Sequence, residues 1–368
     1  MQNWPNTKLG EICSFKYGQM PKASDLADIG YPVFSGYRIV GASSKFHYRE
    51  PEVIVVARGV GGTGDVKMTP PNCFLTNLSI AVLIESNRAD KAFLFYRLGS
   101  KRLWELRTGS AQAQITIERL REYEIELPPI STQRRIAGIL SAYDELIENN
   151  LQRIRILEEI ARSLYREWFV YFRYPGHESV PLTESILGPI PQGWEVKKIA
   201  ELLAKVSRQG KIKTQNYLQT GELPVIDQGR ELVGGYTNDA DVEYSGELPV
   251  IVFGDHTRIL KFIDFPFACG ADGTQLLRSN DERMPVSLFY YTLSAIELSD
   301  FAYARHFKFL KEELVVVPIA EIATDFSERV DPIKRQVRIL QQQSDNLRHT
   351  RDLLLPRLLS GQVNIEES

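Results

Sequence analysis

Residues 59–64 read GVGGTG and follow a strand-like run at residues 53–56, the order of parts found in dinucleotide-binding and S-adenosylmethionine-binding turns. That fingerprint requires a helix to open at its last glycine. Here Pro70 and Pro71 interrupt the chain only a few residues later. We therefore interpret the segment as a flexible glycine loop, not as a nucleotide site.

Other combinations of reactive side chains are equally weak. Glu52, Asp65 and Lys67 fit only loosely a nuclease pattern in which two carboxylates hold a metal beside a lysine. The histidines show no i, i+4 pairing for zinc, and the three cysteines lack C-x-x-C spacing. Neither a phosphate-binding GxxxxGK[ST] loop nor an amino-methyltransferase NPPY-like motif occurs. The sequence therefore favours a non-catalytic protein.

Basic side chains offer a different chemistry, because they gather in three segments with aromatic neighbours or a loop-like background: residues 37–49, 205–213 and 303–311. Arginine and lysine in such loops can reach phosphates or guanine edges, and a glycine loop lets the backbone approach phosphate. Each cluster alone could equally be a solvated charged face. Three such clusters, distributed over both halves of the chain, together favour DNA binding. The candidate DNA contacts are Arg38, Lys45, His47, Arg49, Arg58, Lys67, Lys211, Lys213, Arg230, His256, Arg258, Arg305, His306 and Lys308.

Composition limits the class of protein. The 368 residues are 25% charged and 43% hydrophobic, enough apolar material for two cores. A net charge of −3 means that any surface binding nucleic acid must be local. The N-terminus resembles no signal peptide, no apolar run is long enough to span a membrane, and the separated cysteines suit a reducing compartment. We therefore expect a cytoplasmic protein.

The segments that must position these residues occur twice, about 190 residues apart. Trp4 is answered by Trp194, and the Leu127-Pro128 pair by Val317-Pro318. Each half begins with short β-rich runs separated by glycine, proline and asparagine, and ends in a helix-like segment. Such a duplication predicts two similar modules related by a pseudo-two-fold axis, which suits a target that has two-fold character, as duplex DNA does.

The helix-like segments carry heptad patterns typical of a coiled coil. The first begins near Ser131, a plausible N-cap, and runs to about Tyr171, whereas the second is expected from about Pro332 to Leu355, with Pro356 ending or kinking it. Burying the two stripes against each other predicts an antiparallel pair. The expected positions for helix pairing and partner docking are Leu140, Tyr143, Ile147, Asn150, Ile154, Leu157, Leu164, Trp168, Ile333, Leu340, Leu347 and Leu354.

Asn150 occupies a position in the pattern where a leucine is expected. A buried asparagine can fix the register of a coiled coil at some cost in stability. A solvated asparagine at a slightly misassigned position is the alternative. The second helix departs from the first pattern as well, since Ser344 and Arg351 replace Ile154 and Ala161.

The ends of the two halves resemble the conserved regions of the specificity (S) subunits of type I restriction-modification enzymes. The first region corresponds to ELPPISTQRRI at residues 126–136 and to residues 158–178, and the second to FSERVDPI at 326–333 and RDLLLPRLLSG at 351–361. GSAQAQI at residues 109–115 and YARHFK at 303–308 are similar to elements near the ends of the family's recognition domains. The similarity spans essentially the whole chain.

The resemblance implies an α+β fold, a tandem duplicated chain in which two long antiparallel coiled-coil helices separate two mixed α/β target-recognition domains. The expected parts are a first recognition domain (1–130), a first conserved helix (131–172), a linker rich in proline and glycine (173–193), a second recognition domain (194–320) and a second helix with the tail (321–368). Because the second copy has a different start, Ile319-Ala320-Glu321, we expect the two docking surfaces to be unequal.

The resemblance also implies a function. Each domain would read half of a bipartite site in double-stranded DNA, and the helices would set the spacer and dock methyltransferase subunits, expected to be two. A motor-nuclease subunit would join for cleavage. S-adenosylmethionine is expected on the methyltransferase, and ATP and Mg on the motor-nuclease, with no cofactor in this chain. Two alternatives stay open: a partner with fused nuclease and methyltransferase, or a coiled-coil scaffold that reads no sequence.

Overall fold

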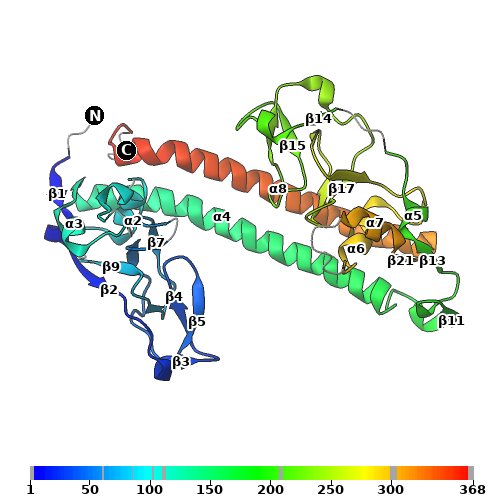
Figure 1. Ribbon diagram of the computed structural model, residues 1–368, viewed down its shortest axis with the longest axis horizontal. Coiled ribbons are helices and arrows are strands. Elements are labelled where there is room, and N and C mark those ends of the chain that lie inside the picture. The colour runs from blue at the N-terminus through cyan, green and yellow to red at the C-terminus, as the bar shows by residue number, and fades with distance from the viewer. Residues whose placement is uncertain are drawn as a thin grey trace. The chain divides into compact units, whose positions relative to one another are not determined.

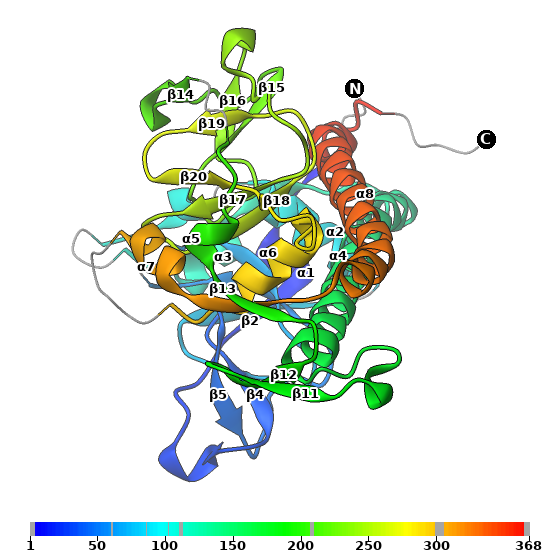
Figure 2. The same ribbon diagram turned by 90° about the vertical axis from the view of Figure 1, so that its right-hand side faces the viewer.

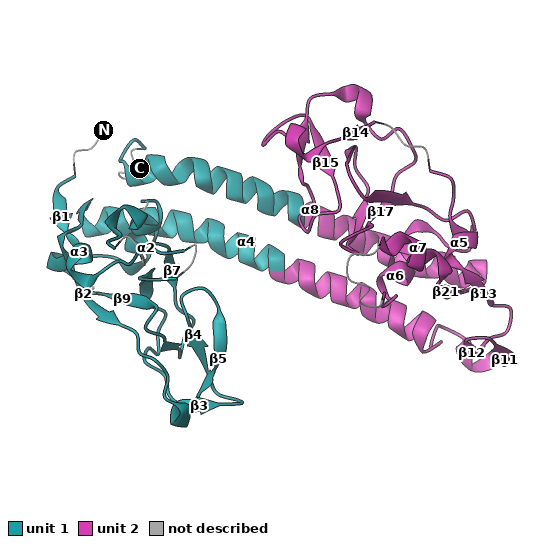
Figure 3. Cartoon of the chain, in the orientation of Figure 1, with its two compact units in different colours: residues 1–151, 341–368 teal, residues 152–340 magenta. Residues whose placement is uncertain are grey.

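The computed structural model describes residues 4–59, 62–85, 87–101, 103–109, 113–206, 210–298 and 305–363. The chain forms two compact units, residues 1–151 with 341–368 and residues 152–340, which Figure 3 distinguishes by colour. Each unit contains one α+β module and parts of both long helices (Figure 1). The predicted α+β class, with two similar modules and two long helices, is confirmed.

The module of unit 1 is built on two four-stranded sheets. In the first sheet, β6 lies between β9 and β7 with antiparallel pairing, and all four of its residues are buried. Burial on both faces explains why residues 53–56 are a continuous apolar run and not an alternating one. The strands of this sheet, in order, are β2 (Cys13–Tyr17), β9 (Ser79–Ile84), β6 (Val53–Val56) and β7 (Val66–Met68). Those of the second sheet are β3 (Leu26–Ala27), β5 (Ile39–Ser43), β4 (Tyr31–Phe34) and β8 (Phe74–Leu75).

Short helices and a two-stranded sheet complete the unit 1 module. Asp90 caps α2 by accepting the Phe93 N–H at 2.9 Å, and Thr116 caps α3 in the same way through Arg119. These elements are β1 (Asn6–Lys8), α1 (Leu9–Ile12), α2 (Lys91–Gly99), α3 (Ile117–Glu122) and β10 (Glu124–Glu126), with 3-10 turns at Ala23–Asp25 and Leu103–Leu106.

The module of unit 2 repeats this plan. Its central strand β17 lies between β20 and β18, as β6 lies between β9 and β7, and Figure 2 shows α6 beside this sheet. The sheets are β18 (Leu260–Ile263), β17 (Val250–Gly254) and β20 (Thr274–Leu277), and then β14 (Lys211–Ile212), β19 (Ala268–Gly270), β15 (Leu223–Ile226) and β16 (Gly235–Thr237). The remaining elements are β13 (Glu195–Lys198), α5 (Ile199–Leu202), α6 (Val286–Ser294), α7 (His306–Glu312) and β21 (Leu314–Val317), with 3-10 turns at Thr214–Asn216 and Ala240–Val242.

The duplication extends to individual ion pairs. In unit 1, Lys8 Nζ lies 2.6 Å from a carboxylate oxygen of Glu122, and in unit 2 Lys198 Nζ lies 2.8 Å from one of Glu312. The two lysines occupy equivalent places in the repeats, as do the two glutamates, at the period predicted from the sequence. Helices α1 and α5 also begin and end at positions related by this period. The two modules are therefore structural repeats down to single side-chain contacts.

The long helices begin at equivalent positions. α4 (Ile130–Tyr165) continues through a π-helical turn (Arg166–Val170), and the start of α8 (Ala320–Leu359) is the counterpart, in the second repeat, of the start of α4. The predicted N-cap at Ser131 is wrong, because Ser131 lies inside α4. The residues at the two helix starts differ although their positions are equivalent, and the expectation of unequal docking surfaces stays a prediction.

The predicted limits of the second helix, about 332 to 355, are corrected at both ends. α8 begins well before Pro332 and continues past Pro356. Buried Ala323, Phe326 and Val330 belong to the core of unit 2, and their packing offsets the hydrogen bond that Pro332 cannot donate.

Residues 173–193, predicted as a linker, contain a β-hairpin. β11 (Leu182–Ser185) pairs with β12 (Gly188–Pro191), and a 3-10 turn (His177–Ser179) precedes them. A two-stranded hairpin has two free edges, so it tolerates prolines that cannot donate to a ladder. Tyr174 and Ile190 pack with Trp194 in the core of unit 2. The proline-rich composition therefore marks an ordered connection.

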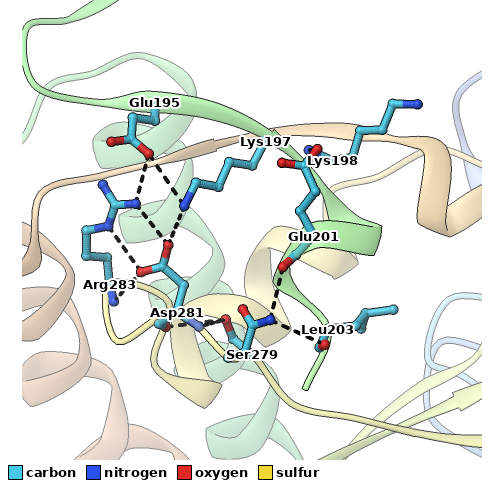
Figure 4. A network of polar contacts seen from close by, with 9 residues as sticks. Glu195, Lys197, Lys198, Glu201, Leu203, Ser279, Asp281 and Arg283 are labelled. Carbon is cyan, nitrogen blue, oxygen red and sulfur yellow. Dashed lines mark hydrogen bonds and ion pairs between the residues drawn. The ribbon is translucent and has the colours of Figure 1, made fainter. Parts of the chain in front are cut away.

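A network of ion pairs and hydrogen bonds joins β13 to the turn before α6 in unit 2 (Figure 4). The Arg283 guanidinium donates to carboxylate oxygens of Asp281 and Glu195, each at 2.9 Å, and Lys197 Nζ donates to Asp281 at 2.9 Å. These hydrogen bonds hold the pKa of Asp281 well below its usual range, and those from Arg283 have the largest effect.

Lys334 lies among the aromatic side chains between α8 and the unit 2 module. Its Nζ is 3.9 Å from the ring centre of Tyr290, 4.8 Å from that of Tyr291 and 5.1 Å from that of Phe262. Cation–π attraction compensates only part of the cost of burying the ammonium group. Burial lowers the pKa of Lys334 to about 8.

Replacing Lys334 with methionine should change the pH dependence of stability. The pKa of Lys334 is depressed in the fold, so the unfolded chain binds more protons above pH 8, and stability should rise there by about 1.4 kcal/mol per pH unit. Urea unfolding of wild type and variant at pH 7 to 9.5 tests this. The variant should lose the rise, whereas a variant with exposed Arg335 replaced by methionine should keep it. Parallel curves for wild type and the Lys334 variant would contradict the prediction.

Among the described residues, no helix is both long and apolar enough to cross a membrane.

Candidate nucleic-acid interface

In unit 1, two loops carry exposed arginines. The first, residues 35–38, follows β4, and Ser35 Oγ accepts the N–H groups of Tyr37 and Arg38 at 3.3 and 3.2 Å. The second, residues 57–64, follows β6, and residues 60 and 61 lie outside its described part. Arg38 and Arg58 are both exposed, and Tyr37 Oη donates to the Arg58 carbonyl at 3.5 Å. The two loops are therefore neighbours. We call 35–38 the first loop and 57–64 the second loop of unit 1.

Unit 2 has the same pair of loops. Its first loop, residues 227–230, follows β15, and Asp227 Oδ1 accepts the Gly229 N–H at 2.8 Å. Its second loop, residues 254–258, follows β17. Arg230 and His256 are exposed there, and Gln228 Oε1 accepts the His256 N–H at 3.1 Å. In both units, an acceptor side chain at the start of the first loop holds a backbone N–H two residues later.

Strand positions identify which basic residues of the first loops correspond. β4 and β15 each have one parallel and one antiparallel neighbour, so they are the same strand of the repeated plan. Their last residues are Phe34 and Ile226. Aligning these two ends makes Arg38 equivalent to Arg230.

Equivalent backbone hydrogen bonds align the second loops of the two units. The carbonyls of Ala57 and Asp255 accept N–H groups from distant segments, those of Ile115 and His306, at 2.8 and 2.9 Å. Arg58, the residue after Ala57, then corresponds to His256, the residue after Asp255. Each module therefore presents two exposed basic side chains at equivalent places.

A buried ion pair, which the sequence analysis missed, supports the first loop of unit 2. Lys261 Nζ lies 3.6 Å from Asp227 Oδ1, and the Tyr217 hydroxyl donates to Asp227 Oδ2 at 3.3 Å. Burial lowers the pKa of Lys261 and raises that of Tyr217 to about 12. These partners compensate the charge of Asp227, which holds the loop. No sequence pattern signals the pair, because Lys261 lies on β18 and Asp227 in a loop far from it in the sequence.

Asp255 fixes the start of α7. Its Oδ1 accepts the Phe307 N–H at 2.8 Å and its carbonyl accepts the His306 N–H. Arg305 and Lys308 are exposed here as expected, but His306 is only 5% exposed. The predicted direct contact of His306 with DNA is corrected, because its ring faces the module interior.

Two other predicted contacts in unit 1, Lys45 and His47, bind residues of their own module. Lys45 Nζ lies 2.8 Å from Asp25 Oδ1, and His47 Nδ1 accepts the Leu75 N–H at 3.2 Å. Burial lowers the pKa of His47, whose ring packs 4.0 Å from that of Phe74. Arg49 is exposed. A DNA-contacting role for these three stays a prediction.

Lys67 lines a separate cavity of about 480 Å³ together with Asp65, Lys101 and Trp104. Glu52, the third member of the loose nuclease pattern, instead pairs with Lys91 at 2.9 Å. Across the described residues, no three potential ligands cluster so as to hold a metal ion. Residues 59–64 lead into β7 and not into a helix, so the nucleotide-binding fingerprint lacks its structural context.

The remaining basic residues of unit 2 lie at or near β14, in the four-stranded sheet, and in the second loop. Lys211 Nζ donates to the Thr274 carbonyl at 3.1 Å, and Lys213 is exposed nearby in the chain. Arg258 Nη1 donates to the Leu298 carbonyl at 2.9 Å. Two further residues of the basic segments, Arg208 and Tyr303, lie outside the described residues, as do parts of the motifs at 109–115 and 303–308.

The residues predicted to pair the helices lie at buried or half-buried positions. In unit 2, Ile154 and Leu157 form a cluster with Leu340, while Trp168 packs near Phe326, so the two helices run antiparallel there. The unit 2 members of the predicted set are Ile154, Leu157, Leu164, Trp168, Ile333 and Leu340, and the unit 1 members are Leu140, Tyr143, Ile147, Asn150, Leu347 and Leu354. Their role in partner docking stays a prediction.

Asn150 is 7% exposed and Ser344 is 1% exposed, so the alternative of a solvated asparagine is wrong. In the alignment of the two long helices from their first residues, Asn150 corresponds to Leu340 and Ser344 to Ile154. The repeated helices therefore place polar residues in unit 1 where unit 2 has apolar ones.

The fold and these loops define a tandemly duplicated protein in which each module ends on a long helix and presents basic loops. The family model described as the type I restriction modification DNA specificity domain matches residues 1–160. The MjaIX specificity subunit of Methanocaldococcus jannaschii is 25% identical over 80% of this chain and 74% of its own. The putative MjaX specificity subunit of the same organism is 23% identical over 99% of this chain and 88% of its own.

A solved structure shows the same fold. The crystal structure of the type I restriction-modification S subunit from M. genitalium superposes with a TM-score of 0.71, at 20% identity, and the match covers 97% of this chain and 96% of that one. Over most of its length the chain is therefore similar to type I restriction-modification specificity subunits, and its first 160 residues match the DNA specificity domain of that family.

Proposed function

We propose that each module of this DNA specificity subunit reads one half of a bipartite site in double-stranded DNA. The observation that carries the proposal is the equivalence of the exposed basic side chains, Arg38 with Arg230 and Arg58 with His256, on matching loops of two repeated modules. Two similar reading surfaces in one chain suit a target with two half-sites. Exposed basic side chains on adjacent loops can contact both the phosphates and the edges of the nucleobases.

The long helices have two tasks in this proposal: they set the unspecified spacer between the half-sites, and they dock two methyltransferase subunits. Repetition of the helix starts at Ile130 and Ala320 supports two similar docking surfaces. The chain itself catalyses no reaction. The methyltransferase subunits bring S-adenosylmethionine and act on an extruded adenine in each half-site, and a motor-nuclease subunit brings ATP and Mg for cleavage. The complex works in the cytoplasm, on DNA methylation and defence against foreign DNA.

Co-expression with the methyltransferase from the same host tests this function. Adenine methylation mapped across the host genome should reveal a new split motif, which disappears when this chain is omitted. Exchange of one module for that of a relative should change one half of the motif only. Unsplit or unchanged methylation, with the complex shown to assemble, would contradict the proposal in favour of a scaffold. Isolation of a single partner containing both nuclease and methyltransferase would identify the fused-enzyme alternative.

A further inference from the structure

We propose that Tyr37 and Gln228 are positioning residues, each of which sets the half-site specificity of its own module by fixing the second loop against the first. The proposal rests on the proposed function. Neither residue need touch a base. Each holds in place the loop that carries Arg58 or His256.

In unit 1, the ring of Tyr37 fills the space between the loops. Its hydroxyl donates to the Arg58 carbonyl at 3.5 Å. A β-carbon added at Gly59 or Gly62 would lie inside van der Waals contact of this ring. Close packing of the backbone on Tyr37 therefore explains the glycines at positions 59 and 62. The position of Arg58 depends on that packing.

In unit 2, the amide of Gln228 does the same work by hydrogen bonding. Its Oε1 accepts the His256 N–H at 3.1 Å, and its Nε2 donates to the Asp272 carbonyl at 2.9 Å. Its own carbonyl accepts the Thr257 hydroxyl at 2.7 Å. A β-carbon at Gly273 would lie 3.0 Å from the Gln228 amide, so here too backbone approaches the side chain closely. One residue thus joins the two loops to the turn before β20.

Tyr37 and Gln228 both hold the second loop against the first, from adjacent positions in the alignment of the two first loops. In the alignment of the first loops, Tyr37 corresponds to Gly229 and Gln228 to Gly36. Each loop therefore has one large side chain and one glycine, in opposite order. Gly36 has φ +91°, a conformation that favours glycine, and a β-carbon there would clash with Ser79 Oγ. Because the supports are chemically unrelated, a change to one should leave the other module intact.

The test uses the full chain in complex with its methyltransferase and three duplexes: the cognate split site, and versions with one half or the other altered. Tyr37→Ala should lower discrimination at one half about tenfold, the scale of one base-pair mismatch, and Gln228→Ala should do so at the other half. Affinity for unrelated DNA and its salt dependence should not change. Tyr37→Phe keeps the ring and should retain discrimination. Each variant is the control for the opposite module.

The outcomes separate the inference from the function on which it rests. If the wild-type complex prefers no split site, the proposed function fails. If the wild type discriminates but both alanine variants discriminate equally well, or if each loses both halves to the same extent, the inference is overturned. Thermal melting accompanies each measurement. Where Tyr37→Ala lowers the melting temperature of unit 1, Tyr37→Leu, which retains apolar volume but lacks the ring, replaces it with the same expected half-selective loss.

Discussion

Replacing Arg38, Arg58 and Arg230 together with glutamine should weaken binding of the complex to its cognate duplex by on the order of 10²- to 10³-fold, since each lost phosphate or base contact costs about 1–3 kcal/mol and such losses are incompletely additive. All three side chains are exposed, and they lie on loops that have equivalent positions in the two modules. The affinity, measured by fluorescence anisotropy at several salt concentrations, should also show a shallower salt dependence, by about one unit of slope for each phosphate contact removed.

A matched control removes the same formal charge elsewhere. Lys8, Lys91 and Lys198 each lie within 3 Å of a carboxylate oxygen, of Glu122, Glu52 and Glu312 respectively. Replacing these three lysines with glutamine changes net charge as the arginine variant does, but it leaves the loops intact. We expect less than a threefold change, on the scale of small surface effects. Equal losses in both variants would mean that general charge attraction, and not the loops, accounts for DNA binding.

Replacing Phe326 with alanine should destabilise unit 2 by about 3–5 kcal/mol, the range for a large aromatic residue in a packed core. Phe326 is fully buried on α8, and its ring centre lies 5.0 Å from that of Phe169 and 6.0 Å from that of Trp168. The alanine would leave a cavity where α4, α8 and α6 meet. Urea unfolding should show a lower midpoint, and hydrogen exchange should place the lost protection in residues 152–340.

Ile339 provides the control on the same helix and in the same unit. It is 46% exposed, so Ile339→Ala removes apolar atoms without opening a cavity and should change stability by about 0.5 kcal/mol or less. A loss below about 1 kcal/mol for Phe326→Ala would show that the aromatic cluster is not the main support of the helix pair in unit 2. A loss of protection confined to unit 1 would also contradict the prediction.

Predictions from the sequence were most accurate where information is local or repeated. The long repeat period, the short strands and the two long helices follow from residue identity and hydrophobic spacing, which are properties of neighbouring residues. Helix boundaries were less accurate. Pro332 and Pro356 indicated helix ends, yet both lie inside α8, because burial of Phe326 and of Leu358 stabilises the turns around them.

The candidate site could be predicted only in part. A basic residue in a glycine-rich segment is visible in the sequence, so Arg38, Arg58, Arg230 and His256 were among the predicted contacts. Their equivalence was not visible, because the loops do not keep the period at which the domain ends repeat. Insertions between strands change the spacing, and only strand neighbours in the sheets restore the alignment.

The sequence by itself determined that this chain is a duplication of two modules that each end in a long helix, and that it resembles specificity subunits, because a repeat and its motifs can be recognised along the chain without the fold. The tertiary structure decided which charged and polar side chains are exposed and which are buried or paired within the protein. It paired Lys45 with Asp25, buried His306 and Lys261, and placed Tyr37 and Gln228 between loops. Pairing and burial arise from contacts between residues far apart in the chain. Those contacts form only when the sheets assemble, and for that reason composition and spacing alone could not reveal them.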